Sequence, residues 1–292
     1  MKSRHTIRIG HNSVEWHGPF FDHMRDCFGP IDFLRWRDSG NWTENYTVLA
    51  LVEGKAIVST VGMTRMKVLV SGGEPRPALQ FGAVATAYDY RGFGAARQLL
   101  EYALQEADGL SLPVILFANQ DVIGFYPRFG FVQVSSHSIY VRHRVVPINL
   151  HSRRLNPDDT GDRDKIIKAA QAARPHQGGL SASPDGSTII WHLFNSGIIA
   201  HELPEGAGVV CTEEKENSLF VAEWLTERDD LDLDLLALTT DRSFDRIELG
   251  FIPRGDRFQS QLDLAADPQA HLFVRHLEQP DEVTHFPDLV VT

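Results

Sequence analysis

The sequence predicts an α/β (α+β) protein of two domains, the first a mixed central sheet flanked by helices and the second smaller. Two observations lead to this prediction. Strand-like apolar runs at residues 79–86 and 112–118 stand on either side of an amphipathic helical pattern at residues 92–107. A polar stretch at residues 151–164 then marks the border between two halves of different charge. Residues 1–150 hold 15 Lys/Arg and 13 Asp/Glu, whereas residues 151–292 hold 13 Lys/Arg and 26 Asp/Glu. We therefore expect domains at residues 1–150 and 151–292.

The elements of the first half follow from local composition. Short helices are expected at 17–28 and 31–37, because a Gly-Pro pair separates two apolar patterns. The turn Glu53-Gly54-Lys55 joins two runs of strand formers and predicts a hairpin. A short helix is expected at 119–126, before Pro127. The strands are expected at 46–52, 56–63, 66–70, 79–86, 112–118, 130–134 and 138–145.

The second half resembles a shortened copy of the first. Trp36 and Glu53-Gly54 recur as Trp191 and Glu205-Gly206, and Gly130-Phe131 recurs as Gly250-Phe251. The interval from Gly206 to Gly250 is shorter than the interval from Gly54 to Gly130, so the second copy is expected to lack about one strand–helix unit. We expect a helix at 162–174, a loop-like stretch at 173–186, and strands at 197–203, 208–212, 219–225, 247–252 and 259–264.

Composition excludes several classes of protein. The net charge of −11 and the balance of the first half argue against a nucleic-acid partner. No run approaches 18 uncharged apolar residues, and no secretion signal opens the chain, so we expect no membrane contact and a cytoplasmic location. Cys27 and Cys211 stand 184 positions apart, which predicts neither a disulfide framework nor a cysteine-based metal site.

An anion-binding loop is predicted where the strand at 79–86 gives way to the helix at 92–107. Arg91, Gly94 and Ala96 satisfy the pattern Arg-x-x-Gly-x-Gly/Ala. Unpaired N–H groups at a helix start, together with the helix dipole, favour a phosphate, and Gly92 and Gly94 let it approach the backbone. The pattern fits a dinucleotide fingerprint or a Walker loop less well. Taken alone, the loop is also compatible with an ordinary tight turn into a helix.

A second motif follows the run at 112–118 and identifies a resemblance. Asn119, Phe125-Tyr126 and Gly130-Phe131 stand in the register seen in the GNAT superfamily, the Gcn5-related N-acetyltransferases. That superfamily also carries the Arg-x-x-Gly-x-Gly/Ala loop one strand and one helix earlier. The two motifs cover residues 84–131, and the order of elements extends the resemblance to about residues 15–146. The fold it implies is GNAT-like, with a degenerate GNAT-like second copy.

The resemblance implies a site for acetyl-CoA between the strands at 79–86 and 112–118, with no metal. Tyr126 matches the residue that often acts as the general acid, and a phenol is protonated at neutral pH. Pro127 replaces a charged residue usual in the family, and Tyr88 replaces a common proline. The residues expected to bind the cofactor are Val84, Ala85, Thr86, Arg91, Gly92, Phe93, Gly94, Ala95, Ala96, Asn119 and Phe125.

The implied activity is an acyltransferase reaction, in which an amine attacks the thioester directly in a ternary complex. The acceptor is a small-molecule or peptide amine, and Asp22, His23 or a terminal carboxylate at Thr292 are candidates for the base. The second half lacks the anion loop after residues 219–225, so it is expected to shape the acceptor pocket or form a homodimer contact. A CoA-binding sensor, a partner-binding scaffold and transfer of a longer acyl group stay open as alternatives.

Overall fold

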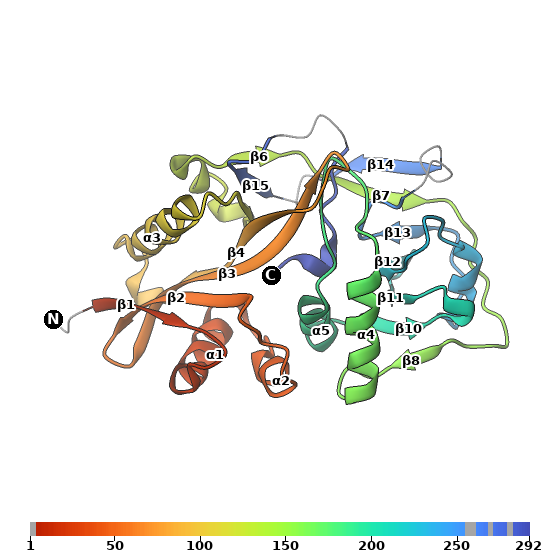
Figure 1. The fold of residues 1–292 in the computed structure, drawn as a ribbon, viewed down its shortest axis with the longest axis horizontal. Coiled ribbons are helices and arrows are strands. Elements are labelled where there is room, and N and C mark those ends of the chain that lie inside the picture. The colour runs from red at the N-terminus through yellow and green to blue at the C-terminus, as the bar shows by residue number, and fades with distance from the viewer. Residues whose placement is uncertain (1–3, 255–260, 268–270, 279–282) are drawn as a thin grey trace.

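Two mixed β-sheets lie side by side in the computed structural model, which describes residues 4–254, 261–267, 271–278 and 283–292 (Figure 1). The first sheet has the order β1-β2-β3-β4-β5-β15-β6, and β9 adds to it by pairing with β3. Its strands are β1 (Arg4–Ile9), β2 (Tyr46–Glu53), β3 (Ala56–Val70), β4 (Arg76–Thr86), β5 (Val114–Phe117), β6 (Val132–Val134), β9 (Leu180–Ala182) and β15 (Leu272–Arg275).

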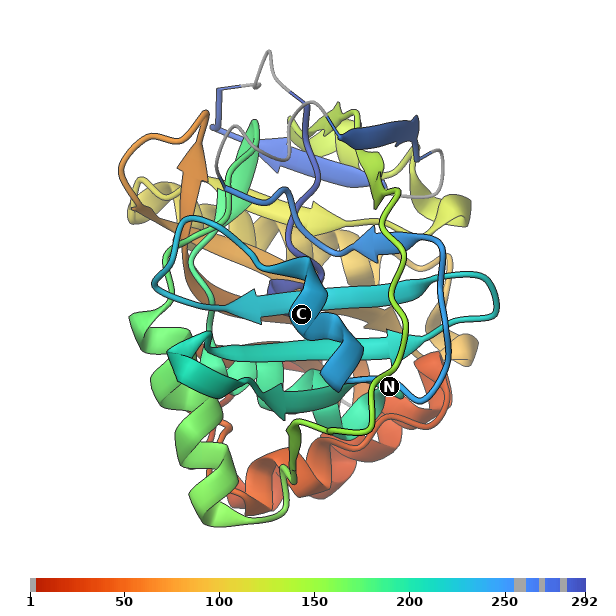
Figure 2. The ribbon, with the colours of Figure 1, turned by 90° about the vertical axis from the view of Figure 1, so that its right-hand side faces the viewer.

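The second sheet has the order β14-β7-β13-β12-β11-β10-β8 and stands in front of the first in Figure 2. Its strands are β7 (His137–Val141), β8 (Arg153–Leu155), β10 (Ile199–Glu202), β11 (Val209–Glu214), β12 (Leu219–Leu225), β13 (Ile247–Leu249) and β14 (Leu262–Ala266). The strand expected at 259–264 corresponds to β14, although residues 259 and 260 lie outside the described residues.

The two sheets share one plan, and each also contains strands from the other half of the chain. In both sheets an antiparallel series leads to one parallel pair, β4–β5 in the first and β12–β13 in the second. An antiparallel strand from the other half of the sequence then follows: β15 pairs with β5 and β6, and β7 pairs with β13 and β14. The internal repeat expected from sequence is therefore present in the topology, and neither sheet is built from one half of the chain alone.

The second copy lacks the long helix that joins the parallel strands of the first copy, as its shorter sequence predicts. The longer helices are α1 (Val14–Phe28), α2 (Phe33–Asp38), α3 (Ala95–Gly109), α4 (Thr160–Ala172) and α5 (Gly186–Asn195). The helix α3 connects β4 to β5 and buries a stripe that includes Leu99, Leu100 and Ala103 against the first sheet. At the same place in the second copy, between β12 and β13, stands only the 3-10 turn η5 (Leu233–Leu238). The stretch at 173–186, expected to be loop-like, holds the short strand β9. Trp191 lies in α5 before β10, as Trp36 lies in α2 before β2.

The helix expected at 119–126 is replaced by two 3-10 turns, η2 (Gln120–Val122) and η3 (Tyr126–Phe129). Pro127 has no N–H to donate and its ring restricts the preceding residue, which explains why no α-helix runs through this segment. The remaining turns are η1 (Tyr88–Tyr90), η4 (Pro204–Gly206) and η6 (Asp288–Val290). None of the helices within the described residues combines the length and the apolar character needed to span a bilayer.

Candidate active site

The strands β4 and β5 separate at the centre of the first sheet. Their parallel pairing covers only Leu79 to Phe81 on β4, opposite residues 114–116, although β4 continues to Thr86. The reason is a bulge: the register of β4 on β3 shifts at Gly82, and Ala83 takes a left-handed φ of +46°. The Thr60 hydroxyl holds this bulge by donating to the Ala83 carbonyl at 2.8 Å. The end of β4 therefore diverges from β5, which is the gap that the resemblance predicts for the pantetheine arm.

The last residues of β4 are fixed from the β3 side. The Ser59 hydroxyl donates to the Ala85 carbonyl at 2.7 Å and shares a 2.9 Å hydrogen bond with the Thr86 hydroxyl. Ala85 is buried, whereas Val84 lines a cavity that opens beside the gap. Within the described residues, the edge of this segment that faces β5 has no strand partner. Its backbone groups are thus placed to pair with an extended ligand.

The glycine loop follows directly and forms the start of α3. Gly92 and Gly94 both have a φ of +81°, a conformation that side chains with a Cβ rarely adopt, and no atom lies within 4 Å of where a Cβ would be. Gly94 is the N-cap of α3 and no side chain caps the helix. The first N–H groups of α3 are therefore available to an anion, as the Arg91–Ala96 loop predicts.

The side chains around this loop have separate tasks. The Arg91 guanidinium donates to the Thr86 carbonyl at 3.1 Å and lies over the Tyr88 ring, so it braces the turn between β4 and α3. Ala95, the first residue of α3, is buried in the core of the first sheet, while the Phe93 side chain is exposed. Among the residues predicted from 91 to 96, the loop backbone thus offers the free N–H groups, the Arg91 side chain braces the turn, and Ala95 packs the helix in place.

The second motif lies on the opposite side of the gap, after β5. Asn119 and Tyr126 both line the cavity, and Phe125 packs edge-on against Tyr126 with ring centroids 5.4 Å apart. Phe273 of the exchanged strand β15 also contacts the Tyr126 ring. Burial raises the pKa of Tyr126 to about 12, so its phenol is protonated throughout the neutral range. The structure thus brings Val84, Asn119 and Tyr126 to one cavity and places Phe125 behind Tyr126.

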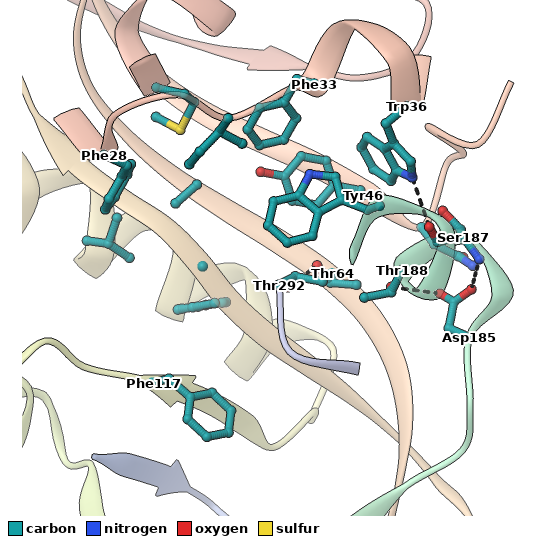
Figure 3. A pocket seen from close by; sticks show the side chains of 18 of the residues that line it. Phe28, Phe33, Trp36, Tyr46, Thr64, Phe117, Asp185, Ser187, Thr188 and Thr292 are labelled. Atoms are coloured by element: carbon teal, nitrogen blue, oxygen red, sulfur yellow. Dashed lines mark hydrogen bonds between the residues drawn. The ribbon is translucent and has the colours of Figure 1, made fainter. Parts of the chain in front are cut away.

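The cavity has a volume of about 250 Å³ and extends from the β4–β5 gap to the contact between the two halves (Figure 3). Phe28, Phe33 and Trp36 lie along one side of it, and Phe117 lies on the other. The helix α5 contributes Trp191 and, at its N-terminal end, Asp185, Ser187 and Thr188. The Trp36 indole N–H donates to the Ser187 carbonyl at 2.9 Å and joins α2 to α5.

Thr292, the last residue of the sequence, lies in the middle of this cavity (Figure 3). Its hydroxyl donates to the Gln80 side-chain oxygen at 3.0 Å and shares a 2.8 Å hydrogen bond with the Thr64 hydroxyl. The His192 ring bonds the carbonyl of the preceding Val291 at 2.7 Å. A Cβ on Gly82 would stand 2.7 Å from the main-chain carbon of Thr292, so only glycine at position 82 leaves room for this residue.

Two of the three candidates for the base lie away from the cavity. Asp22 is exposed and pairs with Arg25 on the outer face of α1. His23 is buried but does not line the cavity, and burial lowers its pKa. Sequence reasoning missed four residues of the cavity, and no local pattern marks them: Thr64 of β3, Gly82 of β4, and Asp185 and Trp191 at α5.

Comparison with known proteins identifies an acetyltransferase domain and a similar overall fold. Residues 13–134 match the model of an acetyltransferase (GNAT) domain. A probable N-acyltransferase of unknown function from Enterococcus faecalis V583 aligns over 94% of this chain and 72% of its own, with 14% identity and a TM-score of 0.62. Eis1 from Mycobacterium abscessus aligns over 92% and 73%, with 16% identity and a TM-score of 0.59. A GCN5-related N-acetyltransferase from Anabaena variabilis aligns over 94% and 73%, with 15% identity and a TM-score of 0.56.

No curated protein matches the chain. The structural likenesses, at these identities, concern the fold, and they extend across both sheets rather than the first alone. The matched domain covers the separated strands, the glycine loop and Tyr126. Residues 13–134 therefore form a GNAT acetyltransferase domain, and the fold of the whole chain is like that of solved GCN5-related N-acetyltransferases.

Proposed function

We propose that the protein is an N-acetyltransferase that moves an acetyl group from acetyl-CoA to a primary amine by direct attack in a ternary complex. One observation carries this proposal: the gap between β4 and β5 and the Tyr126 side chain adjoin one cavity, and the uncapped start of α3 follows β4 within a few residues of that gap. The residues present fit the co-substrate, because the open space at Gly92 and Gly94 admits phosphates and the free edge of β4 admits an extended arm.

Each group has a defined part in the reaction. The N–H groups from Arg91 to Ala96 hold the pyrophosphate, and the backbone of residues 84–86 with Asn119 holds the pantetheine arm. The amine nitrogen attacks the acetyl carbonyl carbon and the carbon–sulfur bond breaks. Tyr126 donates its proton to the departing sulfur, and its raised pKa keeps that proton available at neutral pH.

Thr292 gives the proposal its candidate for the base. The main-chain carbonyl group of Thr292 packs against Gly82. In a protein that ends at Thr292 this group is a carboxylate, and we propose that it accepts the proton of the attacking amine. Appending one glycine after residue 292 moves the carboxylate by about 3.8 Å. We expect this extension to abolish turnover while acetyl-CoA binds as before, and unchanged turnover would assign the proton to another acceptor.

The test of the proposed function combines binding and turnover. Calorimetric titration with acetyl-CoA should show binding, and a panel of amines should show release of free CoA that depends on the amine. Binding without release on any amine would favour the CoA-binding sensor. Faster release from a longer acyl-CoA would favour transfer of a longer acyl group.

A further inference from the structure

The charged groups around the cavity restrict the acceptor. Among the described residues that line it there is no Lys, Arg or His, and Asp185 is the single side-chain carboxylate. Asp185 is already engaged: it accepts the Ser187 N–H at 2.9 Å as the N-cap of α5 and lies 3.5 Å from the Thr188 hydroxyl. A polyamine or an aminoglycoside, with several positive charges, finds here only the engaged Asp185 and the carboxylate proposed at Thr292, which is assigned to the reacting amine. A free amino acid, with its own carboxylate, finds no cation.

The apolar side of the cavity is built from rings held by one another. Phe33 contacts both Trp36 and Trp191, with ring centroids 6.2 and 6.1 Å apart, and so joins α2 to α5. Tyr46 lies edge-on to Trp36 at 5.5 Å. Phe28 at the end of α1 is 43% exposed and stands at the open side of this group. These contacts fix the rings in position before any acceptor arrives, and fixed rings favour a flat aromatic partner over a flexible chain.

We propose that the acceptor is a compact arylalkylamine, a primary amine with one amino group and an uncharged aromatic body. This proposal rests on the proposed function and names its substrate class. The aromatic body packs against Phe28, Phe33, Trp36 and Trp191, and the amino group extends toward Tyr126 and Thr292. The cavity volume of about 250 Å³ lies just below the range of about 300–1,000 Å³ usual for small-molecule sites, which suits a body of one ring system.

The apolar wall also helps the chemistry. An ammonium group removed from water loses its proton more easily, so the wall favours the neutral amine that can attack. The nitrogen forms its bond to the acetyl carbon, the bond to sulfur breaks, and the sulfur takes one proton from Tyr126. The nitrogen releases one proton to the base, and the products are the N-acetyl amine and free CoA.

A matched set of three amines tests the substrate class. 2-Phenylethylamine has the ring and one charge, L-phenylalanine adds a carboxylate to it, and 1,4-butanediamine replaces the ring by a second charge. With saturating acetyl-CoA, we expect kcat/KM for 2-phenylethylamine to exceed that for each of the other two by about 10- to 100-fold, the range expected for burying one ring. An equal or higher value for the diamine, or for an aminoglycoside such as kanamycin, overturns the inference and leaves the proposed function standing.

A charge introduced into the wall gives a second test. Phe28→Asp should lower kcat/KM for 2-phenylethylamine about 10-fold and raise it for the diamine, with the affinity for acetyl-CoA unchanged. Tyr102→Asp is the matched control, because Tyr102 is 45% exposed on α3 and does not line the cavity. An equal effect of both variants overturns the inference.

Binding keeps the inference testable if none of the amines is turned over. 2-Phenylethylamine is then titrated into the protein saturated with CoA, where no transfer can occur. Millimolar or tighter binding that Phe28→Asp weakens supports the inference, and absence of binding overturns it. Acetyl-CoA affinity, measured in the same series, shows separately whether the proposed function has failed.

Discussion

Replacing Gly82 by alanine should displace Thr292 from the cavity. The added Cβ would stand 2.7 Å from the main-chain carbon of Thr292 and closer still to its oxygen. Carbon atoms in contact are about 3.5–4.0 Å apart, so Thr292 must withdraw by about 1 Å or more. The hydrogen bonds of its hydroxyl to Gln80 and Thr64, at 3.0 and 2.8 Å, then break. At about 0.5–1.5 kcal/mol each, they amount to a loss of about 1–3 kcal/mol.

Thermal unfolding and steady-state turnover measure this effect. We expect Gly82→Ala to lower Tm by several degrees and to reduce kcat, while acetyl-CoA affinity stays within a few-fold. Gly109→Ala is the matched control, because Gly109 lies in the last turn of α3 with open space around its Cβ position, and alanine there should be neutral or stabilising. Wild-type Tm and turnover in Gly82→Ala would refute the placement of Thr292.

Two further predictions concern the loop and the second half. Gly94→Glu should weaken acetyl-CoA binding at least about tenfold by calorimetry, because a side chain is strained at a φ of +81° and the added negative charge repels a phosphate. The control Gly109→Glu, at the other end of α3, should bind acetyl-CoA with wild-type affinity. Equal affinities of the two variants would mean that the phosphates bind elsewhere. Burial lowers the pKa of His201 from 6.5 to about 4, and the positive charge of Arg154 adds to the effect. Between pH 6.5 and pH 4, His201 therefore binds a proton in the unfolded chain but not in the folded protein. The free energy of unfolding, measured by denaturant titration, should therefore fall by up to about 3 kcal/mol as the pH drops from 6.5 to 4. His201→Gln should make this fall smaller, and an unchanged dependence on pH would contradict the assignment to His201.

The strands β2 to β6 and the glycine loop before α3 could be predicted from sequence because those signals are local, whereas the strand β1 was not predicted. The stripe of α3 repeats at helical spacing, and the glycines of the loop stand where the backbone needs a positive φ. Tyr126, which the register from Asn119 to Phe131 singles out, lines the cavity. The helix expected around it is replaced by 3-10 turns because of Pro127.

What could not be predicted depends on contacts distant in sequence. The helix α5 is only ten residues long and buries Thr188, Ile189, Ile190, Leu193 and Phe194, so it lacks the polar face that separates a helix from a buried strand. The strands β7 and β15 have ordinary strand composition, and nothing in either shows that it pairs in the other sheet. The apolar side of the cavity is missed for the same reason, since Trp36 reaches Ser187 and Phe33 reaches Trp191 only through the packing of α2 on α5.

The central claim, that the gap beside Tyr126 is an acetyltransferase centre, is tested most directly by one comparison. Acetyl-CoA binding and amine-dependent release of CoA are measured for the wild type and for Tyr126→Phe, which removes one hydroxyl. We predict equal affinity for acetyl-CoA and a fall in kcat of about 100-fold or more in the variant, the usual loss when a general acid is removed. Equal rates of release from the two proteins would contradict the assignment.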